Sequence, residues 1–120
     1  MAIFTVNEAT TFIYTSTLND ELGAPIILTN LTTLLLTLYN LSDLSIINTR
    51  DGQDIKNLNN VTYHATSGLI TWSGQVLDTP IVGSAGVETH IALFEWTYAA
   101  GVKVGKHETT FRVNNLAKVP

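Results

Sequence analysis

The strongest constraint in this sequence is a period of two in two neighbouring segments, 88–98 and 106–113. Within 88–98 the alternate residues from His90 to Tyr98 are apolar, aromatic or histidine, and within 106–113 His107, Thr109, Phe111 and Val113 share one face of an extended chain. Such alternation is typical of a half-buried β-strand, because successive side chains point to opposite faces of a sheet. The residues between the segments include Gly101 and Gly105, and glycine readily adopts the positive φ angles that turns require. We therefore expect an antiparallel hairpin.

The apolar faces also predict the register of this hairpin. We expect Trp96 to lie opposite His107 and Ala92 opposite Phe111, since a slip of one residue would turn Phe111 toward water. Burial of one large side chain such as Phe94 contributes roughly 1.5–3 kcal/mol. The hairpin is therefore the expected centre of the core.

The rest of the chain is expected to form short strands separated by turns. The expected strands are at 1–7 (an edge strand), 10–17, 31–41, 46–48, 61–65 and 69–73. The leucines of 31–41 also occur at helical spacing, but its threonines and its alternation favour a strand buried on both faces. Asp51-Gly52 predicts a turn that returns the chain along 46–48. The longest loop is 75–87, with one helical turn at 76–78.

About seven to eight short strands in 120 residues predict an all-β fold, an antiparallel immunoglobulin-like β-sandwich. A small closed barrel is the alternative. The length is close to the commonest size of one domain. We therefore expect a single domain over residues 1–120, with a short N-terminal arm at 1–7 and a C-terminal tail at 114–120.

Charged residues make up only 13% of the chain, about half of the usual ~25%. Threonine, asparagine and serine fill the polar positions, and such a surface loses its water at a lower cost than one rich in lysine and glutamate. The composition thus favours a protein that works against other proteins. The net charge of −4 and the scattered basic residues argue against nucleic acid as a partner. No apolar stretch approaches the ~18 residues of a membrane span, and the first residues lack the pattern of a signal peptide.

The sequence carries no catalytic signature. It has no cysteine, which excludes disulfides and thiol chemistry. The histidines at 64, 90 and 107 are expected to be core or edge residues rather than metal ligands, and Glu95 has no second carboxylate placed beside it. We expect no enzyme activity, no metal and no cofactor. Trp72 and Trp96 are expected in the core, with a sugar-stacking platform that also includes Tyr39, Tyr63 and Tyr98 as the alternative.

Four segments together resemble a known class of protein. They are 19–26 with its acidic residues, Gly23 and Pro25, and 67–72, 88–98 and 105–113. They are similar to small structural proteins of tailed bacteriophages, which have an immunoglobulin-like β-sandwich. The 19–26 turn is similar to the hairpin that opens many phage virion domains, including the N-terminal domain of baseplate upper proteins. The resemblance covers most of the chain and brings no catalytic residues.

The resemblance implies a protein located in the virion, most simply a capsid cement or decoration protein. Its partners would be the major capsid protein or neighbouring virion proteins, in a homo-oligomer or multi-copy assembly. An adaptor of the neck, tail or baseplate is the first alternative, and a carbohydrate-binding module is the second. Because the sequence stops at Pro120, a separate small subunit is expected rather than a baseplate upper protein.

We expect the contacts of this protein to come from the arm, the 75–87 loop and the tail. The residues concerned are Ala2, Ile3, Phe4, Val6, Val76, Leu77, Ile81, Val82, Val87, Leu116 and Val119. The arm is expected to add a strand to the open sheet edge of a neighbouring subunit.

Overall fold

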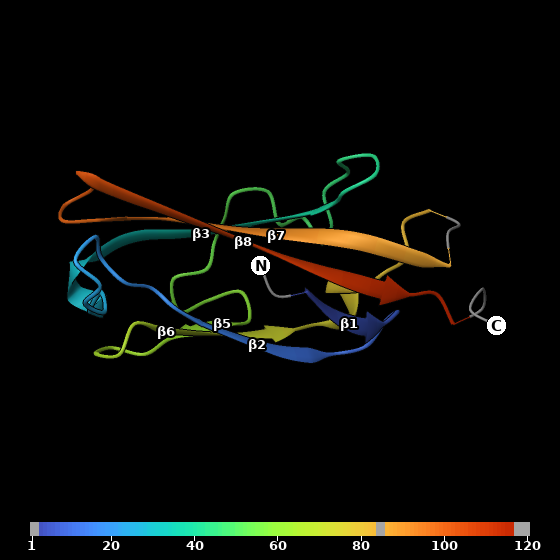
Figure 1. Cartoon of the computed structure of the whole chain (residues 1–120), viewed down its shortest axis with the longest axis horizontal. Coiled ribbons are helices and arrows are strands. Elements are labelled where there is room, and N and C mark those ends of the chain that lie inside the picture. The colour runs from blue at the N-terminus through green and yellow to red at the C-terminus, as the bar shows by residue number, and fades with distance from the viewer. Residues whose placement is uncertain (1–2, 84–85, 117–120) are drawn as a thin grey trace.

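The computed structural model describes residues 3–83 and 86–116, which form an all-β fold as predicted (Figure 1). The strands are β1 (Ile3–Asn7), β2 (Phe12–Thr17), β3 (Leu31–Asn40), β4 (Gln53–Asp54), β5 (Val61–Tyr63), β6 (Leu69–Gly74), β7 (Val87–Tyr98) and β8 (Lys103–Asn114). Two single 3-10 turns, η1 (Leu28–Asn30) and η2 (Val76–Asp78), join them. The helical turn expected at 76–78 is therefore present.

The strands form two sheets that face each other across the core (Figure 1). The five-stranded sheet has the order β1-β8-β7-β3-β4, and the three-stranded sheet has the order β2-β6-β5. Neighbouring strands are antiparallel except β1 and β8, which are parallel. The prediction of a purely antiparallel fold is thus wrong at this one pair.

The core lies between the sheets and is built from alternating residues of their central strands. Leu34, Leu36 and Leu38 of β3 are fully buried on one face, which confirms that segment 31–41 contains a strand and not a helix; the expected burial of both faces is wrong, because the residues between them are only half-buried. From the opposite sheet, the fully buried Trp72 packs edge-on against Phe94 of β7, with 6.0 Å between ring centres. The expectation that Trp72 belongs to the core is therefore confirmed.

The predicted hairpin is β7 and β8, but its register differs from the expected one by two residues. Trp96 lies opposite Gly105 rather than His107. The turn is short, because residues 99–101 all have positive φ angles, and the strand therefore resumes at Lys103. Gly105 is required opposite Trp96, since a Cβ at this position would lie 2.3 Å from the indole ring. The alternation of apolar residues in the sequence does not indicate this contact between Gly105 and the indole of Trp96.

The hairpin expected to pair 46–48 with 53–56 is also wrong. Asp51-Gly52 does turn the chain, with Gly52 at φ +60°. However, the short strand β4 that follows pairs with Leu35 and Leu36 of β3. Ile46 instead forms an isolated bridge with Tyr39 of the same strand.

A buried ion pair holds the 41–60 loop against the rest of the molecule. Arg50 and Asp78 are both at least 99% buried, and two contacts join them, Nε–Oδ1 at 2.6 Å and Nη2–Oδ2 at 3.1 Å. The guanidinium also lies 5.6 Å from the ring centre of Trp72. Such a pair is costly to bury but much more costly to break. It fixes η2 against the loop, a contact that no local sequence pattern indicated.

Candidate functional site

The two halves of β8 differ in what lies on the side away from β7. The half from Thr110 to Asn114, called the covered half below, pairs with β1. The half from Lys103 to Thr109, called the open half, pairs with β7 on one side only, and no strand in the described part of the chain pairs with its other side. At ~3.4 Å per residue the open half exposes roughly 24 Å of strand edge.

The direction of the free backbone groups follows from one hydrogen bond. The N–H of Glu8 donates to the carbonyl oxygen of Asn114 over 2.9 Å, so the backbone of Asn114 faces β1. Backbone groups of alternate residues in a strand point to the same edge, and β8 pairs with β7 without a register shift. The same orientation therefore applies to Val104, Lys106 and Glu108. Their N–H and C=O groups point outward and have no partner among the described residues.

In the covered half, β1 closes the space between the two sheets. The ring of Phe4 lies 5.0 Å from that of Phe111, 5.6 Å from that of Phe12 and 5.9 Å from that of Tyr14. Phe111 is fully buried beneath it. One added strand thus supplies both sheet hydrogen bonds and a large side chain that fills the gap between the sheets.

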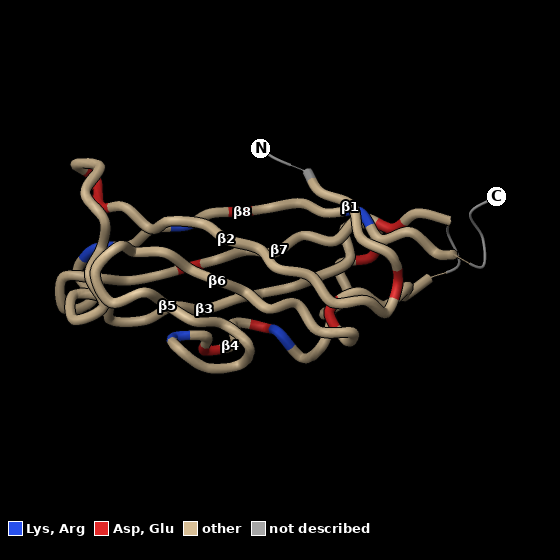
Figure 2. Tube along the Cα trace, turned by 90° about the horizontal axis from the view of Figure 1, so that it is seen from below, with Lys and Arg blue, Asp and Glu red and all other residues tan. Residues whose placement is uncertain are grey.

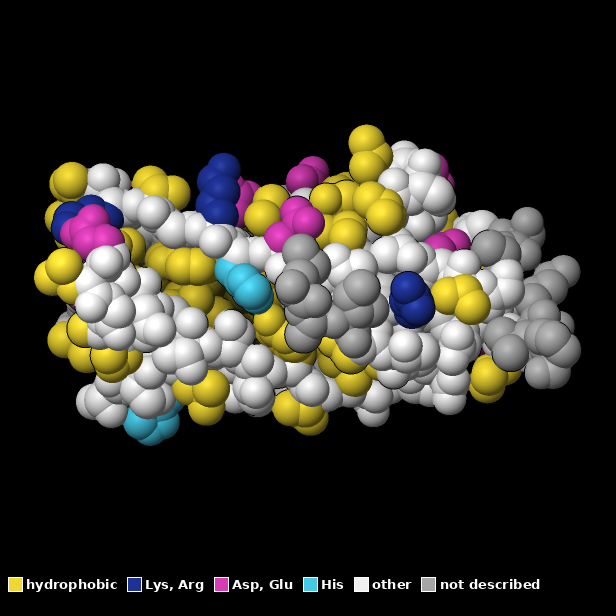
Figure 3. Space-filling model, viewed as in Figure 1, with side chains coloured by type: hydrophobic (Ala, Val, Ile, Leu, Met, Phe, Trp, Pro, Cys, Tyr) yellow, Lys and Arg dark blue, Asp and Glu magenta, His cyan; other side chains and the backbone are white. Residues whose placement is uncertain are grey.

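In the open half no such side chain is present, and a hollow remains between the sheets. Figure 3 shows hydrophobic side chains at the bottom of this hollow, toward the left of the view. At its rim the exposed His107 lies with Nε2 3.0 Å from the hydroxyl oxygen of Tyr14 on the opposite sheet. The histidine ring stacks on Phe94 with 6.5 Å between ring centres.

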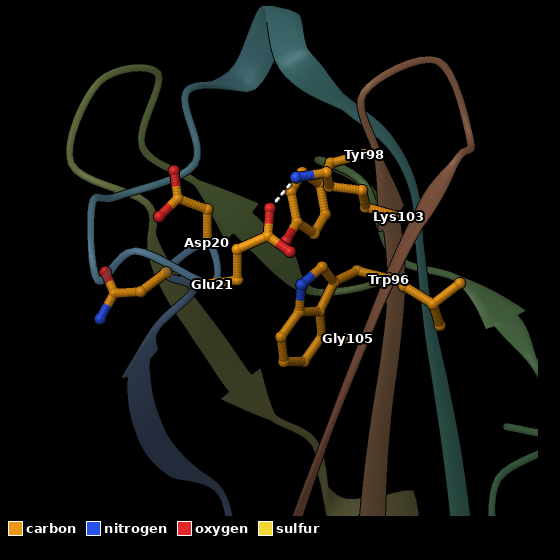
Figure 4. Close-up of a pocket in the computed structure, with 8 residues that line it drawn as sticks. Asp20, Glu21, Trp96, Tyr98, Lys103 and Gly105 are labelled. Atoms are coloured by element: carbon orange, nitrogen blue, oxygen red, sulfur yellow. Dashed lines mark ion pairs between the residues drawn. The ribbon is translucent and has the colours of Figure 1, made fainter.

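A pocket of about 300 Å³ opens at the turn end of the open half. It is lined by Asn19, Asp20, Glu21, Trp96, Tyr98, Lys103, Val104 and Gly105. Figure 4 shows the Trp96 indole entering the pocket from β7 and the Glu21 carboxylate above it, paired with Lys103. Trp96 is only 8% exposed, and its indole nitrogen has no hydrogen-bond partner.

A face without charge lies on the other side of the molecule. The strands β2, β5 and β6 contain no charged residue (Figure 2). Their outward side chains are mainly threonine, with the exposed Ile13 and Leu69 among them. Because no ionised group would have to lose water there, this face is suited to contact with another protein.

The N-terminal arm is not a loose segment, because its residues Ile3–Asn7 form strand β1 of the five-stranded sheet. Phe4 and Val6 are half-buried in β1 and pack against the core, and β1 pairs within its own sheet. Because β1 is the terminal strand of its sheet, no strand of the described residues pairs with its edge away from β8, and strand addition by the arm to a neighbouring subunit stays a prediction. Ile3 is the first residue of β1. Ala2 and Val119 lie outside the described residues.

The other expected contact residues lie toward the end of the molecule where β8 finishes, away from the β7–β8 turn (Figure 1). Those with exposed side chains are Val76, Leu77, Val82, Val87 and Leu116. Ile81 is half-buried and packs against the core. The open half of β8 was not among the expected contacts, although the polar His107 among apolar alternating residues was a signal for it.

The aromatic residues considered for sugar binding are mostly internal. Tyr63, Tyr98 and Trp96 are 4%, 6% and 8% exposed, and Trp72 is fully buried. They offer no ring face for stacking. As for metals, the described residues contain no group of three or more histidine or carboxylate side chains arranged to hold an ion.

A second buried polar pair lies beside the covered half. His90 Nε2 and Glu88 Oε1 are 2.8 Å apart, and the carboxylate also accepts the N–H groups of Val82 and Gly83, each at 2.9 Å. Burial raises the pKa of Glu88, but these hydrogen bonds and the nearby histidine outweigh it and lower its pKa overall. His90 is fully buried, while Glu88 borders a pocket of about 420 Å³ between the start of β7 and the end of β3.

The comparisons with known proteins add no relative. Among the described residues no helix is long and apolar enough to cross a membrane. No protein-family model, no curated protein and no solved structure matches the chain.

Proposed function

We propose that this chain is a non-enzymatic structural protein of a tailed-bacteriophage virion, a cement or decoration protein that binds the capsid shell. Its partners are the major capsid protein or neighbouring virion proteins, and it is present in many copies. The resemblance of four segments to small virion proteins supports the setting. The observation that carries the binding role is the open half of β8, with unpaired backbone groups above a hollow lined by aromatic rings.

In this proposal an extended segment of a neighbouring subunit adds to the open half as a further strand. The backbone groups of Val104, Lys106 and Glu108 then gain hydrogen bonds, and strand addition of this kind is a common mode of peptide recognition. The covered half supports the idea, because β1 already binds β8 there and fills the gap with Phe4. The incoming strand places its inward side chains over the pocket beside Trp96 in the same way.

The uncharged face of β2, β5 and β6 supplies further contact area. A standard interface takes ~800 Å² from each partner, about one eighth of the 6329 Å² that the domain exposes. A strand alone covers less than that, so a second surface is needed for a stable contact. The proposal includes the finer fold class, an immunoglobulin-like sandwich, which the two facing sheets and the core Trp72 support.

The copy number of the chain in purified particles tests its location. Quantitative mass spectrometry is expected to give a ratio to the major capsid protein near one, or a simple fraction of it. A copy number of only a few per particle would instead indicate an adaptor of the neck, tail or baseplate. If the chain is missing from particles, the virion proposal is wrong.

The variant Lys106→Pro tests the binding edge. Proline removes the outward N–H of residue 106 and leaves the ladder with β7 intact, as is typical of proline in edge strands. Particles assembled with this variant should lose it on purification, while its melting temperature stays near that of the native chain. Lys106→Ala is the matched control, since it removes the same charge but keeps the N–H, and it should be retained. Equal retention of both variants would contradict docking at the open half.

A further inference from the structure

The pocket at the turn end of the open half contains a hydrogen-bond donor that the fold leaves unused. The indole nitrogen of Trp96 is buried and has no hydrogen-bond partner, and the residue as a whole is only 8% exposed. A buried N–H without an acceptor costs roughly 1–3 kcal/mol. The indole of Trp72 is also unpartnered, but it is sealed in the core, whereas Trp96 lines the pocket (Figure 4), with its nitrogen closed to solvent in the free domain.

We infer that this pocket binds one uncharged carboxamide side chain, asparagine or glutamine, of the strand that pairs with the open half. The inference rests on the proposed function and names what the partner must contain. The indole N–H donates to the carboxamide oxygen, and the carboxamide NH₂ donates to the carboxylate of Glu21.

The position of the pocket links it to the open edge. Trp96 passes directly beneath Gly105, where only a glycine leaves room for the ring. The indole atoms Nε1, Cε2 and Cζ2 therefore lie directly beneath β8, next to the edge along which an added strand would run. A residue of that strand opposite Gly105 faces inward, because Gly105 itself shares the inward parity of His107.

The charges at the pocket favour a neutral group with both a donor and an acceptor. Glu21 and Lys103 pair across the opening, and both are about half exposed, so the pair is weak and free to rearrange. A carboxylate would be repelled by Glu21. An ammonium group has no acceptor for the indole N–H. A carboxamide satisfies Glu21, Lys103 and Trp96 together.

A sugar is the weaker occupant, although its hydroxyl groups also donate and accept. Sugar sites commonly present a ring face, and here Trp96 and Tyr98 are 8% and 6% exposed. The pocket also continues into the open edge of β8, as a side-chain pocket beside a strand would. These two observations favour a peptide.

The test uses an extended peptide as the probe and NMR of the whole ¹⁵N-labelled domain as the readout. The probe is acetyl-Val-Lys-Leu-Glu-Gln-Val-Thr-amide, which in antiparallel pairing sets Glu opposite Lys106, Lys opposite Glu108 and Gln opposite Gly105. Two control peptides replace Gln by Leu or by Glu. The backbone amide signals of Val104, Lys106 and Glu108 report strand addition, and the indole N–H of Trp96 reports the pocket.

The Gln peptide should shift both sets of signals, while the indole signal of Trp72 stays in place. The two control peptides should bind at least tenfold more weakly and leave the Trp96 indole unshifted. If all three peptides shift the edge amides equally, strand addition holds and the carboxamide pocket is wrong. If no peptide shifts the edge amides, the binding edge itself is wrong.

Two further outcomes would overturn the inference independently of the peptides. One is an indole N–H of Trp96 that is already protected from exchange in the free domain and loses this protection in Glu21→Ala, because the donor would then already be satisfied by Glu21. The other is a shift of the same indole signal on addition of galactose or cellobiose in the absence of a response to the Gln peptide.

Discussion

The covered and open halves of β8 belong to one strand and face the same core, yet their inward residues are of different kinds. In the covered half Phe111 and Val113 are fully buried beneath β1. In the open half the corresponding positions are Gly105, His107 and Thr109; His107 is exposed and Gly105 half-buried, while Thr109, next to the covered half, is buried. The covered half therefore has the large apolar residues of a closed core, whereas Gly105 and His107 of the open half can remain in contact with water.

This difference shows that the open half is built to be stable without a partner. The contact between His107 and Tyr14 places polar groups over the aromatic rings of the hollow. Lys106 stands near the middle of the free edge, and lysine at an edge opposes pairing between identical copies. A partner with an acidic residue opposite Lys106 would complement its charge.

Of the substitutions in the two halves, Phe111→Ala in the covered half should have the largest effect on stability. Phe111 is fully buried and contacts Phe4, Phe12 and Trp72. Its removal should lower the free energy of unfolding by about 3–5 kcal/mol. Urea denaturation followed by tryptophan fluorescence measures this. A loss below about 1 kcal/mol would mean that β1 does not seal the covered half.

The second-largest effect is expected from Gly105→Ala in the open half. The new Cβ would lie within 2.5 Å of three atoms of the Trp96 ring, so the indole must move. Overpacking of this kind costs about 1–3 kcal/mol, and the near-ultraviolet circular dichroism should change with it. Gly101→Ala is the control, because no atom lies within 4 Å of a Cβ there, although its φ of +83° adds some strain. An unchanged spectrum in Gly105→Ala would contradict the close packing.

Part of the pH dependence of stability should come from Glu88, which lies opposite Val113 of the covered half. Hydrogen bonds to the carboxylate lower the pKa of Glu88 despite its burial, so the folded state holds the ionised form more strongly than the unfolded state does. This stabilisation is present above the usual pKa of 4.5 and is lost as the pH falls through the lower folded value. Urea denaturation at a series of pH values should show the loss, and Glu88→Gln should flatten it. A wild-type curve that stays level at acid pH would be inconsistent with this assignment.

The smallest effect is expected for His107→Ala. The side chain is exposed and its one hydrogen bond, to Tyr14, is exposed as well. The change should cost about 1 kcal/mol or less, while the exchange of nearby amides becomes faster. If His107→Ala destabilises the domain as much as Phe111→Ala, the two halves are energetically alike and the distinction between them fails.

The alternation of residues was enough to predict β7, β8 and β6 and the faces that they bury. Trp72, Phe94 and the leucines of β3 lie in the core because a period of two leaves little choice of face. The register of the hairpin required more, since it depends on the fit of one indole against Gly105. That contact is between side chain and backbone across two strands, and no local pattern encodes it.

The parts of the site that the sequence did not predict depend on long-range pairing. Whether the edge of β8 is open depends on how far β1 extends along it, which is set by the fit of Phe4 between the sheets. The Arg50–Asp78 pair likewise joins residues from separate loops. The pocket combines the 19–21 turn with Trp96 and Lys103, which are distant in the sequence.

The pairing of the first described strand with the last has a consequence for folding. During synthesis β1 emerges from the ribosome long before β8 exists, so this part of the sheet closes only at the end. Closing so long a loop carries a large entropic cost, and topologies rich in such contacts fold slowly. Until β1 docks, the whole outer edge of β8 is exposed. At high concentration the β1 of one molecule can reach the β8 of another, and a domain-swapped dimer is then the expected kinetic trap.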